Sequence, residues 1–429
     1  MCIALLSTAH PLYKLILLSN RDEYLTRPTA PATWWSPEHP AVLGGRDLLR
    51  PTRGTWLGIT RTGHLAVLTN YREDTPPPAY AVSRGEIIKT FLTRDPTDPA
   101  DVEDWAKRII ATGTARDAGG FTLVCGHVLD PRGLVVLSNR AEVGGGPLER
   151  VGGEVVQTVG VSNGPFDVEG TSERWSKVVE GERQLLRVIR ENIVLRERSK
   201  SSRARDAVNG DDGKDHNDDG GRKEGEAATK DDENETKKAE DRFLHRLLEI
   251  LSTDTLTPTG IDPQAGLDVH VQQLRNTILV PPLGKTVENQ NTKPNINRDT
   301  NMNMNTNMGM NMDTHTNTDT DTDTLHLTHT DAKANNKTDP AHSTLKPSSS
   351  TPLPLSSTTQ PPSTSQVETE SNLYATQKQS IILIDQTNRV RFFERTLFDG
   401  SGRAVVNKEH GAGDVQFEFQ IEAGGGVGV

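Results

Sequence analysis

Apolar residues in this chain come in short, nearly continuous runs, and most runs occur in pairs that flank turn residues. Such pairs are typical of antiparallel hairpins, and one further run predicts a single strand. The predicted strands are 2–7 with 14–19, 56–60 with 65–69, 121–128 with 134–138, 381–384 with 389–393, and 155–161 alone. Because the runs hardly alternate with polar residues, we expect both faces of each strand to be covered.

Four other segments have the spacing of amphipathic helices. They are residues 83–92, 101–110, 172–196 and 241–252. The first opens with Ser83-Arg84-Gly85-Glu86, which has the form of a capping box. Hairpins covered on both faces, together with these helices, predict an α+β fold of two stacked sheets between helical layers.

Two polar blocks interrupt this pattern, at 199–240 and 285–370. They explain why apolar residues are only 33% of the 429 residues. Neither block has enough apolar surface to offset the chain entropy lost on folding, so we predict that both are disordered. The rest of the chain is long enough for one sizeable domain.

Composition narrows the classes of function. The net charge is −11 and the sequence has no concentrated basic stripe, which argues against nucleic-acid binding. Cys2 and Cys125 are the only cysteines, so no disulfide framework is expected. No apolar run is long enough for a transmembrane segment, and no basic region opens a secretory signal. These features together predict a cytoplasmic protein. His64 and His127 lack metal-ligand spacing, so we predict no metal or cofactor.

The N-terminal hairpin brings a cysteine to a polar run. If its strands pair about the centre of residues 8–13, facing positions sum to about 21 or 22. Cys2 then lies opposite Ser19 or Asn20, and Arg21 and Asp22 emerge just beyond the strand end. The hairpin therefore places one thiol beside a guanidinium and a carboxylate.

Position 2 has a special chemistry. A methionine ahead of a small residue is normally removed, which would leave Cys2 with a free α-amine that acts as a base near neutrality. A thiol and an amine on one residue are the nucleophile and base of an N-terminal-nucleophile enzyme. Arg21 would favour the thiolate, and Asp22 would orient the amine. The alternative is a small apolar Cys2 in a buried strand, with a salt-bridged turn at the strand end.

Several strands end in Ser/Thr-Asn, and the asparagines are candidate oxyanion donors. Asn20, Asn70 and Asn163 are the candidates, whereas Asn139 is interpreted as a turn residue at the end of a strand. Cys125 lies mid-strand and is predicted to be a core residue.

The order of separated motifs resembles the NRDE family, which is the family of transport and Golgi organisation protein 2. The residues that carry the resemblance are Cys2, Asn20-Arg21-Asp22-Glu23, Arg27-Pro28, Gly54-Thr55-Trp56-Leu57-Gly58, Leu68-Thr69-Asn70-Tyr71, Ser83-Arg84-Gly85-Glu86, Val161-Ser162-Asn163 and the C-terminal segment 374–395. The resemblance covers 1–195, 241–282 and 372–400.

The resemblance implies a four-layer αββα sandwich similar to N-terminal-nucleophile hydrolases. It also implies Cys2 as nucleophile, Arg21 and Asp22 as its partners, Asn163 as an oxyanion or orienting residue, and Asn70 as a weaker candidate. The predicted organisation is one domain in three parts, 1–198, 241–284 and 371–400, with inserts at 199–240 and 285–370 and a partly disordered tail at 401–429.

Two functions follow from the resemblance. The first is hydrolysis of an amide or thioester bond in a small-molecule or lipid-like acyl substrate. The second is a non-catalytic scaffold that binds such a ligand or a trafficking partner. The family is associated with Golgi organisation and with mitochondrial lipid or haem handling, so association with either organelle is expected. One departure concerns the site, because this chain has Gln377 where the family often has arginine.

Overall fold

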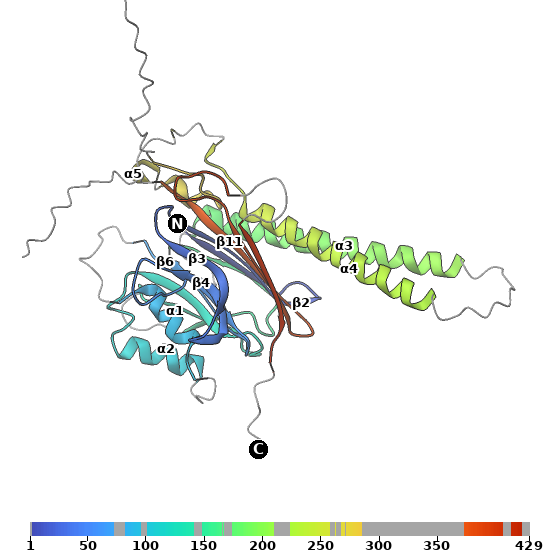
Figure 1. The fold of residues 1–429 in the computed structure, drawn as a ribbon, viewed down its shortest axis with the longest axis horizontal. Coiled ribbons are helices and arrows are strands. Elements are labelled where there is room, and N and C mark those ends of the chain that lie inside the picture. Colours follow the sequence, from blue (N-terminus) through green and yellow to red (C-terminus); the bar gives the residue numbers. More distant parts are fainter. Residues whose placement is uncertain are drawn as a thin grey trace, which may run out of the picture. The chain divides into compact units, whose positions relative to one another are not determined.

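Two antiparallel sheets stack face to face at the centre of the fold (Figure 1). The computed structural model describes residues 2–72, 82–95, 101–140, 148–164, 166, 174–209, 224–257, 262, 267–270, 272–284, 373–405 and 413–422. All of these residues belong to one unit, Met1–Glu288 with Thr369–Val429. The predicted insert 285–370 lies outside the described residues.

The first sheet has six strands and joins the two ends of the sequence. Its order is β10 (Thr158–Val161), β1 (Ile3–Ser7), β2 (Tyr13–Tyr24), β11 (Tyr374–Asp385), β12 (Arg389–Thr396) and β13 (Asp414–Gln420). The predicted N-terminal and C-terminal hairpins are therefore neighbours, through the pairing of β2 with β11.

The second sheet is a meander of seven strands in chain order. They are β3 (Thr29–Trp35), β4 (His39–Asp47), β5 (Leu57–Thr60), β6 (His64–Asn70), β7 (Phe121–His127), β8 (Leu134–Ser138) and β9 (Glu149–Val151). The sequence pattern predicted the hairpins β5–β6 and β7–β8 but not β3, β4 or β9.

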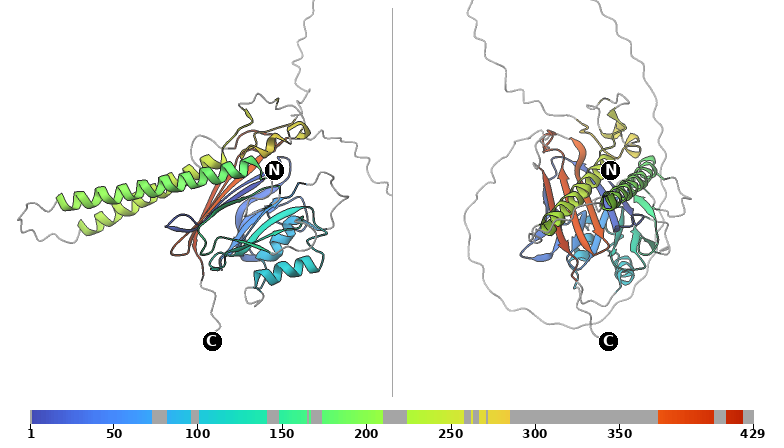
Figure 2. Two further views of the ribbon diagram at one scale, coloured as in Figure 1. Left: turned by 180° about the vertical axis from the view of Figure 1, so that it is seen from behind. Right: turned by 90° about the vertical axis from the view of Figure 1, so that its right-hand side faces the viewer.

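Helices cover the outer face of each sheet, as Figure 2 shows. On the second sheet, α1 (Arg84–Leu92) and α2 (Val102–Ala111) pack against β5–β8. On the first sheet, α3 (Ser176–Asn209) and α4 (Glu224–Leu251) pack against β10, β1, β2 and β11. Two short helices, α5 (Leu267–His270) and η2 (Gln273–Arg275), follow α4. The predicted four-layer αββα arrangement is confirmed.

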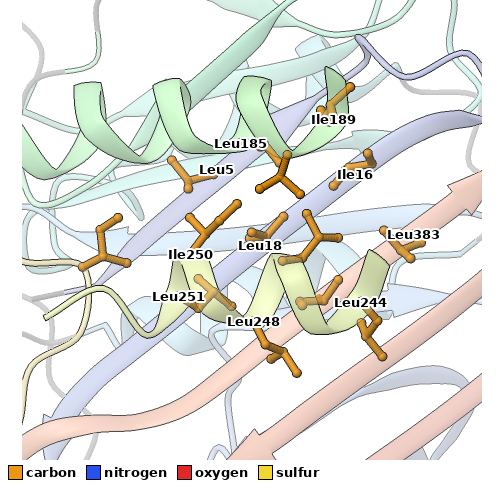
Figure 3. Close-up of a cluster of buried hydrophobic side chains, with 14 of the residues drawn as sticks. Leu5, Ile16, Leu18, Leu185, Ile189, Leu244, Leu248, Ile250, Leu251 and Leu383 are labelled. Atoms are coloured by element: carbon orange, nitrogen blue, oxygen red, sulfur yellow. The ribbon is translucent and has the colours of Figure 1, made fainter. Parts of the chain in front are cut away.

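Three apolar clusters fill the spaces between the four layers. In the first sheet, successive residues of β1 point to opposite sides: Ile3 and Leu5 face α3 and α4, and Ala4 faces the second sheet. Figure 3 shows the cluster under the two helices, where Leu185 and Leu248 pack above Leu5 and Leu18. Burial on both faces explains why these strands read as continuous apolar runs.

The observed pairing of β1 with β2 differs slightly from the predicted one. Ile3 faces Asn20, so facing positions sum to 23 rather than 21 or 22. The polar run Asn20–Glu23 also does not leave the strand, because β2 continues to Tyr24. The reason is the pairing of β2 with β11, about 350 residues later in the chain, which no local pattern in the hairpin reveals.

The segment 199–240, predicted to be disordered, is partly helical. Helix α3 continues to Asn209 and α4 begins at Glu224, while 210–223 lies outside the described residues. The segment is rich in Lys, Arg, Glu and Ala, which favour helix, and charged pairs one turn apart support it. Lys238 and Glu235, for example, are 3.0 Å apart.

Helix α1 begins where it was predicted, but without the predicted cap. Ser83 is the N-cap residue, and its side chain makes no capping hydrogen bond. The backbone N–H of Glu86 instead donates to the Ser83 carbonyl.

Candidate active site

The polar run of β2 divides between the two faces of the first sheet. Asn20 points to the helical layer, where its amide nitrogen donates to the carbonyls of Leu251 and Ile278 at 2.8 and 2.9 Å. Arg21 points between the sheets, and its guanidinium lies 4.6 Å from the ring centre of Trp56. The alternation of a strand therefore separates side chains that are adjacent in sequence.

Cys2 lies immediately before β1 and is surrounded by polar groups. Its Sγ is 3.8 Å from the backbone oxygen of Asp22. Its own carbonyl accepts hydrogen bonds from the Ser162 hydroxyl at 2.7 Å and from the Lys177 ammonium at 3.4 Å. The predicted meeting of Cys2 with the polar run of β2 is thus present in the structure.

Lys177 is a charged residue of this site that sequence reasoning missed. It lies in the first turn of α3 and has no exposed surface, and its ammonium is 5.5 Å from the ring centre of Trp175. Burial lowers its pKa, and the nearby Asp22 opposes that shift. The helix dipole disfavours a lysine in the first turn of a helix. The position of Lys177 is therefore not explained by helix stability. The sequence offers no signal that separates Lys177 from a solvent-exposed lysine of an amphipathic helix.

Asp22 is held in place from β11. Its carboxylate accepts a hydrogen bond from Thr376 at 2.7 Å, and its backbone oxygen accepts one from the Tyr374 hydroxyl at 3.1 Å. Burial raises the pKa of Tyr374 well above its usual value, and the Asp22 carboxylate adds to the shift. Tyr374 therefore remains a neutral donor, and the backbone beside the Cys2 sulfur is fixed.

The thiol of Cys2 does not have the lowered pKa that the sequence suggested. Burial raises the pKa, since only 8% of the residue is exposed, and the contributions that lower it, including that of Arg21, are smaller. Arg21 is committed elsewhere: it donates to the Gln377 side chain and lies 3.7 Å from Glu23. The resting thiol is accordingly neutral.

Gln377 occupies a β-bulge between Thr376 and Lys378. Where the family often has arginine, this chain has a neutral acceptor for Arg21. Beside it, the buried Lys378 and Glu394 lie 3.8 Å apart. The space between the sheets thus contains a second group of buried charges, separate from those around Cys2.

The candidate asparagines have different positions. Asn163 is buried beside Ser162, whose hydroxyl lies 3.4 Å from the Asn163 side-chain oxygen. Asn70 ends β6, one residue after Thr69, whose hydroxyl donates to the Ser162 carbonyl at 2.8 Å. Asn20 is not available as an oxyanion donor, because its amide nitrogen bonds two carbonyls of the helical layer.

The residues interpreted as structural lie in the second sheet. Cys125 is fully buried in β7, and burial raises its thiol pKa to about 12. Asn139 bridges the backbone of Phe121 and Ala115, as expected for a loop residue. His64 and His127 face each other across β6 and β7.

The described part of the chain contains no group of three or more His, Cys, Asp or Glu side chains placed to hold a metal ion. Among the helices described, none combines the length and the apolar character needed to span a membrane.

Comparison with known proteins gives one family. A sequence model of the family described as "Transport and Golgi organisation 2" matches residues 1–226 and 219–399. The mouse Transport and Golgi organization 2 homolog is 35% identical over 133 residues, which are 30% of this chain and 45% of that protein. An uncharacterized Saccharomyces cerevisiae protein is 30% identical over 206 residues, 45% of this chain and 64% of its own length. The chain thus spans about half the length of the curated relatives it matches.

A solved structure of a Caenorhabditis elegans N-acylethanolamine-hydrolyzing acid amidase ortholog is also similar. The similarity covers 43% of this chain and 77% of the amidase chain, with 10% sequence identity and a TM-score of 0.30.

Proposed function

The chain belongs to the Transport and Golgi organisation 2 family, and we propose that it is an N-terminal-cysteine hydrolase of an amide or thioester bond. The observation that carries the proposal is the polar surrounding of Cys2, whose carbonyl is held by Ser162 and Lys177 and whose sulfur lies against the backbone of Asp22. A cysteine that served only as a small apolar residue would not need a fully buried lysine beside it.

In the proposed reaction, removal of the initiator methionine frees the α-amine of Cys2. The amine takes the thiol proton as sulfur attacks the substrate carbonyl, and it returns that proton to the leaving amine or thiol. Water then hydrolyses the acyl thioester on Cys2 and restores the thiol. Burial raises the thiol pKa, so the mechanism assigns the α-amine as the base that takes the thiol proton during the attack.

The surrounding residues would have distinct roles. Asp22, fixed by Thr376, would orient the α-amine. Asn163 is the favoured oxyanion donor because it adjoins Ser162, and Asn70 is the second candidate. Arg21 would act from the space between the sheets, as a positioning residue linked to Gln377.

The proposal extends to organisation and place in the cell. We propose a single hydrolase domain formed by 1–198, 241–284 and 371–400 together with the remainder of α3 and α4 and with β13, which the insert 285–370 interrupts. A role in the Golgi and secretory pathway is part of the proposal, because relatives are named for Golgi organisation. Removal of 290–370 is expected to leave the melting temperature unchanged, and a large loss of thermal stability would contradict the description as an insert.

The second candidate function is a non-catalytic scaffold that binds an acyl-linked small molecule or a trafficking partner. It is favoured by the small exposure of Cys2 and by its raised thiol pKa, since reactive cysteines are usually accessible and acidic. In that case the α-amine of Cys2 would have no role, so a retained or acetylated Met1 would be tolerated.

Two measurements separate these functions. The intact mass of the purified protein reports whether Met1 is present, and a retained methionine would exclude the hydrolase. A thioester acyl probe should label the wild type at Cys2 and release the label with hydroxylamine. Cys2→Ala should abolish the labelling, whereas the matched variant Cys125→Ala should retain it. Equal labelling of both variants would contradict the proposal.

A further inference from the structure

A second site lies between α3 and α4, away from Cys2. A groove of about 730 Å³ lies between the two helices and shares Val188 and Phe243 with the apolar cluster beneath them. Val188 and Leu195 of α3 and Phe243 of α4 form its apolar walls. This volume is in the range of pockets that hold small organic ligands.

Asn192 and Arg196 line one end of the groove, and His10 contacts Asn192. The carboxamide oxygen of Asn192 accepts from Arg196 Nε and from His10 Nε2, both at 3.1 Å. His10 Nδ1 accepts from the backbone N–H of Leu12, so the ring proton lies on Nε2. Burial lowers the pKa of His10, and Arg196 adds to the shift, so this imidazole is neutral. Arg196 is therefore the cation of the group.

Arg196 is unusual among the charged residues near the groove. Its Nη2 is shielded from solvent without a hydrogen-bond partner, and no carboxylate of the described residues lies within 4 Å of its guanidinium. The neighbouring carboxylates are engaged elsewhere, Glu191 with Arg246 at 2.8 Å and Glu240 with Arg389 at 2.7 Å. A partly buried guanidinium without a counter-charge is costly unless an anion completes the site.

We propose that the groove between α3 and α4 binds a linear monocarboxylate with an apolar chain. The carboxylate pairs with Arg196, and the chain lies along Val188, Leu195 and Phe243. Lys238 and Arg246 also line the groove but are paired with Glu235 and Glu191, whereas Arg196 is not paired with a carboxylate of the described residues. Arg196 therefore matches a single negative charge, and the apolar walls match a hydrocarbon chain. The proposal does not depend on Cys2 or on hydrolysis.

The test uses the full chain and two fluorescent probes, 11-(dansylamino)undecanoic acid and the corresponding neutral alcohol. The wild type should bind the acid saturably, with a blue shift of the dansyl emission. Arg196→Gln should weaken binding of the acid about tenfold or more, because a charge-assisted hydrogen bond is lost. Binding of the alcohol should not change. The matched control is Arg198→Gln, which removes an exposed arginine two residues further along α3.

A second variant tests the apolar wall. Leu195 is 61% exposed, so Leu195→Asp should fold normally yet weaken binding of both probes. The proposal is overturned if the acid shows no saturable binding, if Arg196→Gln and Arg198→Gln behave alike, or if binding disappears as the chain self-associates, since a second copy would then occupy the groove.

Discussion

Cys2 precedes the first strand of one sheet, and Cys125 lies in the middle of a strand of the other. Both are buried, and burial raises the pKa of both thiols. Their surroundings differ: Cys125 has Ala66 and Val135 opposite it on the neighbouring strands, whereas the atoms around Cys2 include the Lys177 ammonium and the Ser162 hydroxyl. Burial alone therefore does not distinguish Cys125 from the cysteine that we propose to be functional, whereas the polarity of the surroundings does.

The interior of the second sheet and the surroundings of Cys2 also differ in the charges that they contain. In the second sheet, burial lowers the pKa of His64 to about 3, so the imidazole stays neutral. Around Cys2, the carboxylate of the buried Asp22 raises the pKa of the buried Lys177 and so favours its charged form. Opposite charges compensate one another there, which an apolar sheet interior does not allow.

The largest loss of stability is expected when the negative charge of Asp22 is removed. Asp22→Asn should lower the free energy of unfolding by about 3 kcal/mol at pH 7, because Lys177 then remains buried without its counter-charge. The loss should diminish at alkaline pH, where Lys177 releases its proton. Urea denaturation at pH 7 and pH 10 measures both effects.

The control for this variant is Asp241→Asn. Asp241 is half-exposed and pairs with the buried Arg391, which also lies near Glu240 and Glu418. Because Arg391 keeps these two carboxylates, the loss of Asp241 should cost less than about 1 kcal/mol. Similar costs for the two variants would contradict the distinction between the regions.

A matched serine substitution tests the two cysteines directly. Cys125→Ser should cost about 2 kcal/mol, because it buries a hydroxyl in an apolar cluster. Cys2→Ser should cost less than about 1 kcal/mol, since the Asp22 carbonyl is available as an acceptor. Thermal denaturation of the two variants gives the comparison, and a reversed order would refute it.

The sequence predicted much of the layered fold because local patterns encode it. Continuous apolar runs identified β1, β2 and the hairpins β5–β6, β7–β8 and β11–β12. The strands β3 and β4 were missed because their buried and exposed positions are mixed and each contains proline, which is depleted in strands.

The site was predicted in outline only. The local hairpin brings Cys2 to the polar run, but the face on which each side chain lies depends on β11, which is remote in sequence. That pairing assigns Thr376 to Asp22 and Gln377 to Arg21. Lys177 was missed because an isolated lysine on an amphipathic helix is ordinarily a solvent-exposed residue.

A smaller effect is expected from the hydroxyl that holds Cys2. Ser162→Ala removes the 2.7 Å hydrogen bond to the Cys2 carbonyl and leaves the longer one from Lys177. We expect a loss of about 1 kcal/mol in the free energy of unfolding. Ser199→Ala, which removes an exposed hydroxyl on α3, should have no measurable effect in the same urea titration.

The smallest expected change in stability concerns His64. It tests whether the second sheet excludes a buried charge. Burial is the main reason that its pKa falls to about 3, and Arg94 and His127 lower it further. In the unfolded chain the imidazole takes up a proton near pH 6.5. Protons therefore favour the unfolded chain, so the contribution of His64 to stability is complete above pH 6.5 and decreases as the pH falls toward 3.

His64→Phe removes this titration and retains an aromatic ring against Phe91, whose centre lies 6.0 Å from that of His64. Between pH 6.5 and pH 5 the wild type should lose more stability than the variant, by about 1 kcal/mol at most, because partial exposure lets solvent reduce the penalty. Chemical denaturation at several pH values gives the two slopes, and measurement at pH 7.5 supplies the packing cost of the substitution alone. Parallel slopes would mean that His64 accepts a proton in the folded chain, and the second sheet would then tolerate a charge as the surroundings of Cys2 do.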